Sequence, residues 1–97
     1  MIRIGDFVSA RLVERSQGLL KSGIGQKEGI YLKKHSNTVT IDLLDADALA
    51  KLHSGEIKEI KPDMLHECWL YGATLVQDQN LSKIIREQIL ALRSTLK

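Results

Sequence analysis

Two runs of alternating apolar and polar residues, joined by a short polar turn, constrain the fold of this chain most. The runs are "GIYLKK" at residues 29–34 and "TVTIDL" at residues 38–43. Alternation with a period of two is typical of a half-buried strand. The intervening His35–Asn37 suits a turn, because Asn tolerates left-handed backbone angles and Ser and Asn side chains bond their own backbone. The pattern therefore predicts a β-hairpin, with these residues facing inward: Ile30, Leu32, Val39, Ile41 and Leu43.

Similar patterns predict further elements on both sides of this hairpin. "DFVSARLV" alternates as a first strand, and residues 44–55 have helical spacing, with Asp45 placed to cap the start and Gly55 to end the helix. "EIKEIKP" at residues 56–62 is expected to be a short strand that Pro62 ends. "ECWLYGATLV" at residues 67–76 is expected to be a final strand with a bend at Gly72.

The glycine-containing stretch "GLLKSGIGQKEG" at residues 18–29 is expected to be a mobile loop. Its glycines do not fit the dinucleotide-binding motif GxGxxG, because Glu28 stands at the position of the third glycine. They do not fit a phosphate-binding P-loop either, because that motif continues with Lys and Ser/Thr into a helix, whereas strand residues follow Gly29. Three apolar residues in this loop are expected either to plug the core or to contact another protein, and we take the second as the site prediction: Leu19, Leu20 and Ile24.

Residues 80–97 predict an amphipathic helix, with Asn80 as its N-cap and apolar residues on one stripe. Such a helix is marginal alone, so it is expected to pack against its own sheet or against another chain. The predicted contact residues on the stripe are Ile85, Ile89, Leu92 and Leu96.

Length and composition predict one domain over residues 1–97, with a mainly β body at 1–78 and the helix at 80–97. The 97 residues are 43% hydrophobic, which suffices for a single core. A single cysteine excludes an intrachain disulfide. Charges at Arg3 and Asp6 interrupt the apolar stretch that a signal peptide needs, and the longest apolar run is too short to cross a bilayer as a helix. The expectation is a cytoplasmic protein that does not contact a membrane.

Charge is distributed unevenly, although the net charge is only +2. Residues 1–40 carry +4, residues 41–80 carry −5 and residues 81–97 carry +3. Basic side chains on the first strand, its loop and the hairpin could contact nucleic-acid phosphates, although a charged hairpin edge also blocks unwanted strand pairing. The candidates are Arg11, Arg15, Lys21, Lys27, Lys33 and Lys34.

The order of these signals resembles an SH3-like small β-barrel of the KOW and Tudor kind. The matching segments are "GDFV", "GIYLKKHSNTVTIDL" and "EIKEIKPDML". The resemblance implies a fold with a small antiparallel barrel and a binding role toward nucleic acid or protein. With the inserted helix and the C-terminal helix, the expected class is α+β.

No group of residues in the sequence has the spacing of a catalytic, cofactor or metal site. His66 and Cys68 lie two apart, but zinc sites use further Cys/His pairs, and nucleophilic catalysis needs an oriented base. We therefore expect no cofactor and no enzymatic activity. The expected function is that of an adaptor or regulatory subunit that binds another protein or a second copy of itself; the alternative is nucleic-acid binding.

Overall fold

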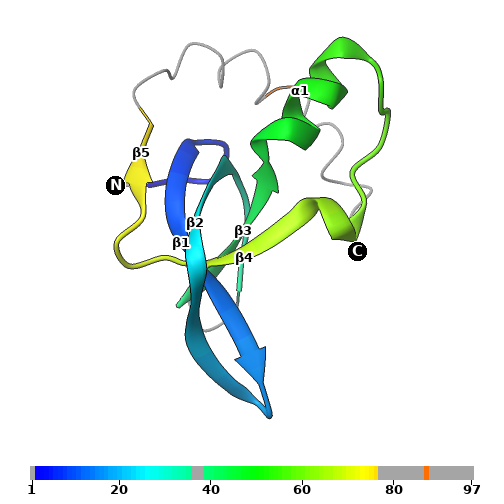
Figure 1. Cartoon of the computed structure of the whole chain (residues 1–97). Helices are drawn as coiled ribbons and strands as arrows, with labels where there is room; N and C mark the ends of the chain where they lie inside the picture. Colours follow the sequence, from blue (N-terminus) through cyan, green and yellow to red (C-terminus); the bar gives the residue numbers. More distant parts are fainter. Residues whose placement is uncertain (1, 36–38, 77–86, 88–97) are drawn as a thin grey trace.

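A closed antiparallel β-barrel of four strands forms the body of the computed structural model, which describes residues 2–35, 39–76 and 87 (Figure 1). The sheet order is β2-β3-β4-β1-β5, and β1 also pairs with β2, which closes the barrel. β5 pairs with β1 as an extra strand. The elements are β1 (Phe7–Ser16), β2 (Leu19–Lys34), β3 (Thr40–Asp45), α1 (Ala46–Ser54), the 3₁₀ helix η1 (Pro62–Met64), β4 (Leu65–Trp69) and β5 (Thr74–Leu75).

The predicted central hairpin is confirmed as β2 and β3. Of its predicted inward residues, Ile30, Leu32, Ile41 and Leu43 are fully buried. The register shifts between Tyr31 and Lys33, so Leu32 has no direct partner on β3. Tyr31 is also buried, at 3% exposure, although the alternation placed it on the outward face.

Two apolar clusters make up the core. The first is built from strands alone: Val8, Ala10, Tyr31, Ile41, Leu43 and Cys68. The second also includes Leu49 of α1 and Ile60 from the segment that follows it: Phe7, Ile30, Leu32, Leu44, Leu49 and Ile60. The short helix thus covers apolar strand residues that the barrel strands would otherwise expose.

Helix α1 forms where the sequence predicts it. The backbone N–H of Asp47 donates to Asp45 Oδ1 at 2.8 Å, so Asp45 is the N-cap. At the other end Gly55 has φ of 82°, and its N–H donates to the carbonyl of Leu52 at 3.2 Å. This left-handed C-cap explains why glycine ends the helix.

The prediction of a mobile loop at residues 18–29 is wrong. Residues from Leu19 onward form the first part of β2, which pairs with β1 from Ser16↔Leu19 to Phe7↔Ile30. The turn consists of Gln17 and Gly18, whose φ angles of 52° and 78° match the primed turn type that two-residue hairpins favour. The other glycines lie within the strand.

The predicted strand at residues 56–62 is also wrong. These residues pair with no other described strand. Ile60 is instead buried in the second cluster, and Pro62 begins η1. The next strand, β4, starts only at Leu65, after η1. The predicted final strand is divided, because β4 ends at Trp69 and Gly72, with φ of 82°, makes the expected bend before β5.

The predicted helix at residues 80–97 lies outside the described residues, apart from Glu87. None of the helices in the described part of the chain is long and apolar enough to cross a membrane.

Candidate protein-binding surface

The C-terminal half of β1 and the N-terminal half of β2 form a hairpin that extends beyond the barrel body (Figure 1). Its ladder runs from Val13↔Ser22 to Ser16↔Leu19. β3 pairs with β2 only from Gly29 onward, and β4 pairs with β1 at Leu12. Among the described strands, the end of the hairpin therefore has no partner beyond its own two strands.

A bulge in β2 marks the base of this hairpin. The register passes from Arg11↔Gln26 to Val13↔Ser22, so residues 23–25 lie opposite the single residue Leu12. Gly25 has φ of 85°, which L side chains rarely adopt, and a Cβ on Gly23 would lie 3.1 Å from both the Cβ and the carbonyl oxygen of Leu12. Both positions of the bulge thus favour glycine, Gly25 because of its backbone angle and Gly23 because of the close contact with Leu12.

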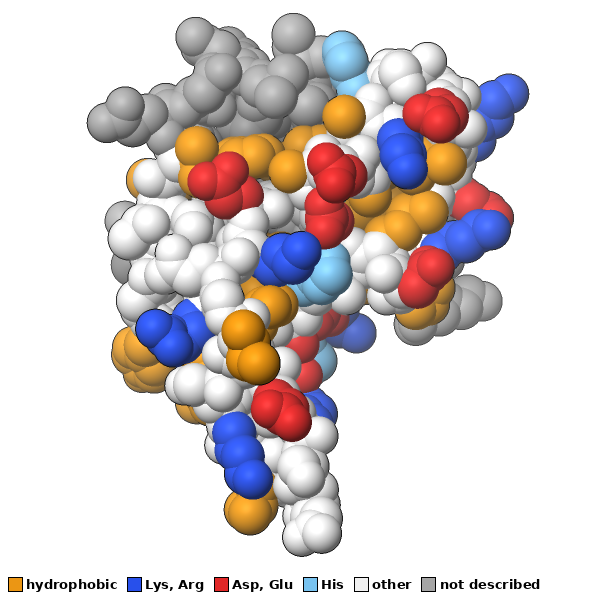
Figure 2. All heavy atoms as spheres, viewed as in Figure 1, with side chains coloured by type: hydrophobic (Ala, Val, Ile, Leu, Met, Phe, Trp, Pro, Cys, Tyr) orange, Lys and Arg blue, Asp and Glu red, His pale blue; other side chains and the backbone are white. Residues whose placement is uncertain are grey.

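The bulge turns Ile24 into solvent. Its side chain is 94% exposed, and Leu19 near the hairpin turn is 62% exposed, whereas Leu20 is half-buried. The predicted apolar contact residues Leu19, Leu20 and Ile24, which we call the hairpin surface, thus belong to one hairpin, and Ile24 does not plug the core. In Figure 2 this projection carries a few apolar and charged side chains among polar and backbone atoms. Burying an isoleucine side chain contributes about 1.5–3 kcal/mol of free energy. Ile24 is not buried in the folded chain, so this contribution is available to the binding of a partner.

A bidentate ion pair ties the hairpin to the barrel. Arg15 Nε donates to Glu67 Oε1 at 2.7 Å and its Nη2 donates to Oε2 at 2.6 Å. Thr40 Oγ1 also donates to Glu67 Oε2, at 2.8 Å. The guanidinium lowers the pKa of Glu67, and this effect outweighs partial burial, which favours the neutral acid. Three strands, β1, β3 and β4, thus converge on one carboxylate.

A second acidic side chain lies beside this pair. His35 Nε2 is 2.9 Å from Asp42 Oδ1 and 3.8 Å from Glu67 Oε2. Asp42 and Glu67 face each other across β3 and β4. Sequence reasoning missed this polar cluster, because the five residues that form it share no motif and only the strand register brings them together: Arg15, His35, Thr40, Asp42 and Glu67.

The predicted basic residues do not form one uniform patch. Arg15 is held by Glu67, and Lys27 Nζ lies 3.9 Å from Asp45 Oδ2, so a carboxylate offsets each of these charges. The other four candidates are exposed on β1 and β2: Arg11, Lys21, Lys33 and Lys34.

The apolar contact residues predicted on the C-terminal helix lie outside the described residues: Ile85, Ile89, Leu92 and Leu96.

Cys68 is poorly placed for chemistry. Its side chain is fully buried, and burial, with smaller contributions from Asp42 and Glu67, raises the pKa of the thiol to about 11. The thiol is therefore protonated near neutral pH and a weak nucleophile. Nearby His66 instead bonds Asp45, with 2.8 Å between Nε2 and Oδ2. The described residues contain no group of three or more His, Cys, Asp or Glu side chains that could hold a metal ion.

Comparisons of the chain with protein-family models, with curated proteins and with solved structures find no significant match.

Proposed function

We propose that this chain is a non-enzymatic binding module, an adaptor or regulatory subunit, that contacts another protein through the hairpin surface. The observation that carries the proposal is the 94% exposure of Ile24 on a bulge that two glycines make possible. Ile24 shares its hairpin with the exposed Leu19 and the half-buried Leu20, and exposed apolar side chains that gather on one feature are characteristic of protein-binding sites.

The way the hairpin is anchored supports this role. Because two guanidinium nitrogens of Arg15, Nε and Nη2, bond Glu67, the hairpin is restrained relative to the barrel before any partner arrives. A restrained surface loses less conformational entropy on binding than a loop does, and its affinity is correspondingly higher. We further infer that the barrel is SH3-like, of the KOW or Tudor kind, a resemblance that implies binding rather than catalysis.

The test compares proteins captured from a native extract by three immobilised chains. Ile24→Ser removes the central anchor, and Tyr71→Ser, on a residue 78% exposed in the turn before β5, is the matched control. We expect specific partners to be retained by the wild type and by Tyr71→Ser, and to be reduced about tenfold with Ile24→Ser. Equal capture by all three chains would contradict the proposal.

Nucleic-acid binding is the alternative, and four exposed basic side chains on β1 and β2 support it. Lys33 and Lys34 are adjacent at the end of β2 and both are exposed. Replacing both by Glu should lower the affinity for single- and double-stranded DNA and RNA. No detectable binding of any of these probes to the wild type at about 50 mM salt would remove this alternative.

A further inference from the structure

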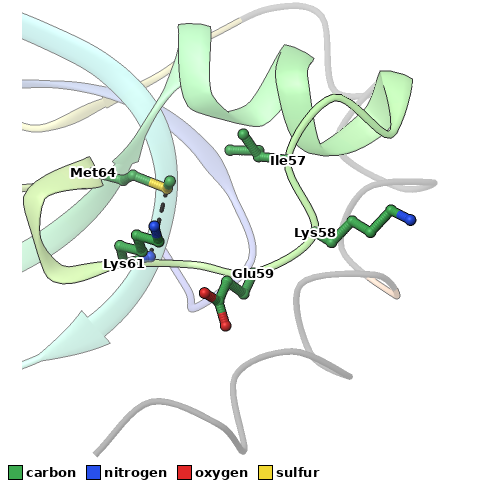
Figure 3. A pocket seen from close by; sticks show the side chains of 5 residues that line it. All are labelled: Ile57, Lys58, Glu59, Lys61 and Met64. Carbon is green, nitrogen blue, oxygen red and sulfur yellow. Dashed lines mark hydrogen bonds between the residues drawn. The ribbon is translucent and has the colours of Figure 1, made fainter.

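Two adjoining hollows lie along the segment that joins α1 to η1. One, of about 330 Å³, is lined by Ile57, Lys58, Glu59, Lys61 and Met64 (Figure 3). The other, of about 260 Å³, is lined by Asp45, Asp47, Ala48, Lys51, Ile57, Asp63, Met64 and His66. They share Ile57 and Met64, so we treat them as one feature, the α1 groove.

The α1 groove has an apolar floor. Ile57 and Met64 are half-buried, and Met64 packs against the core cluster that contains Leu49. In Figure 3 the charged ends of Lys58 and Glu59 point away from Ile57, whereas Lys61 lies beside Met64. A groove with this floor can accept aliphatic side chains.

The rim of the second hollow is acidic. Three aspartates border it against a single lysine, Lys51. Asp45 is bonded to His66, whereas Asp47 and Asp63 have no ion pair within the described part of the chain. The carboxylates thus outnumber the one lysine of the second hollow, whereas Lys58 and Lys61 border the first. The second hollow, with its apolar floor, therefore favours an occupant that is both apolar and basic.

We propose that the α1 groove binds the C-terminal segment of the same chain, residues 81–97. This segment has the required chemistry, because it carries a net charge of +3 and an apolar residue at most positions of one helical stripe. Its basic residues are Lys83, Arg86, Arg93 and Lys97. The proposal is independent of the hairpin surface.

The point where the chain leaves the barrel also favours this occupant. Val76, the last residue described before the segment, packs against the same core cluster as Met64 and Leu52. Its N–H donates to the carbonyl of Phe7 at 2.9 Å, which holds it in place. The four residues 77–80 can span up to about 13–14 Å, so the segment begins close to the cluster that underlies the groove.

Hydrogen exchange on the full chain tests this assignment, with synthetic peptide 81–97 as the unprotected reference. We expect the amides of residues 81–97 in the wild type to exchange at least about tenfold more slowly than in the peptide. The double variant Asp47→Lys/Asp63→Lys reverses the rim charge, and Ile57→Ser removes part of the floor. Each should lower this protection at least about threefold, while Ile24→Ser on the hairpin should leave it unchanged.

Three results would overturn the proposal. The first is exchange of residues 81–97 at the rate of the peptide. The second is protection that neither the rim variant nor Ile57→Ser reduces, because the segment then lies elsewhere. The third is protection that appears only at concentrations where light scattering detects a dimer, since the groove is then filled by a second copy. Protection that persists in the monomer supports binding within one chain.

Discussion

At the scale of single residues, the side chain of Glu67 connects three strands, its own β4 with β1 and β3. It accepts from Arg15 and Thr40, and its pKa is lowered from the usual 4.5. A carboxyl whose pKa is lower in the folded state stabilises the fold above its unfolded pKa, and this contribution is lost as the pH falls through the folded value. Stability should therefore fall as the pH drops below about 4.5.

The variant Glu67→Gln isolates this effect. It keeps the size of the side chain but removes the charge that titrates, so its stability should depend less on pH between about 5 and 3 than that of the wild type. Urea unfolding at several pH values measures the difference. Identical pH profiles for the two proteins would show that the Arg15 pair contributes no pH-dependent stability.

Gly29 shows how a single missing side chain permits two strands to approach. A Cβ there would overlap the carbonyl oxygen of Leu44 and lie 2.9 Å from its carbonyl carbon. Since both obstacles are backbone atoms, no rotamer change relieves them, and Gly29→Ala should cost about 1–3 kcal/mol or more of unfolding free energy.

Gly25→Ala is the matched control, because the site is open and only its φ of 85° opposes a side chain. Its cost should be smaller, about 1 kcal/mol. Urea unfolding of both variants gives the comparison, and a larger loss for Gly25→Ala would mean that β2 and β3 separate easily at Gly29.

At the scale of elements, α1 depends on one aspartate with two roles. Asp45 accepts from the N–H of Asp47 through Oδ1 and bonds His66 through Oδ2. Burial alone would raise the pKa of Asp45, but the bonds from Asp47 and His66 prevail and lower it. Asp45→Ala should lose about 0.5–2 kcal/mol of stability, and Asp45→Asn should lose less because Asn also caps helices. Thermal unfolding of the two variants decides this, and equal losses would show that the cap contributes little.

The elements also show where sequence reasoning succeeds. The β2–β3 hairpin and α1 were predictable, because each has a regular apolar period and recognisable end residues, such as Asp45 and Gly55. The strand at residues 19–29 was not predictable from the sequence. The bulge at Gly23–Gly25 interrupts the alternation, and few apolar side chains of the hairpin are buried, so the sequence shows no regular period of two there. Glycines required by a bulge and glycines of a loop are alike in sequence.

The strand prediction for residues 56–62, after α1, was wrong for a different reason. Ile57 and Ile60 favour a strand by composition, but three-residue spacing does not match a strand's period. In the structure Ile60 is buried in the second core cluster while the chain returns toward η1 without pairing. Tertiary packing, which one sequence does not reveal, determines the conformation here.

At the scale of the whole molecule, the candidate site was only partly predictable. Leu19, Leu20 and Ile24 were identified because apolar residues among glycines are conspicuous, although they lie on a strand rather than a loop. The pairing of Arg15 with Glu67 was not predictable, because they are 52 positions apart in the sequence and only the pairing of β1 with β4 in the sheet brings them together. This pairing leaves the molecule with fewer uncompensated basic residues than its sequence suggests.

The response to salt distinguishes the two functions for the molecule as a whole. Apolar contact through Ile24 is not screened, so capture of a protein partner should change little between about 50 and 500 mM NaCl. Phosphate contacts from all four exposed basic residues, Arg11, Lys21, Lys33 and Lys34, would instead weaken nucleic-acid binding about 10³- to 10⁴-fold over this tenfold range. Nuclease-treated extracts give the measurement at both concentrations. Partners that are lost at high salt, or after nuclease treatment alone, would favour nucleic-acid binding over the hairpin surface.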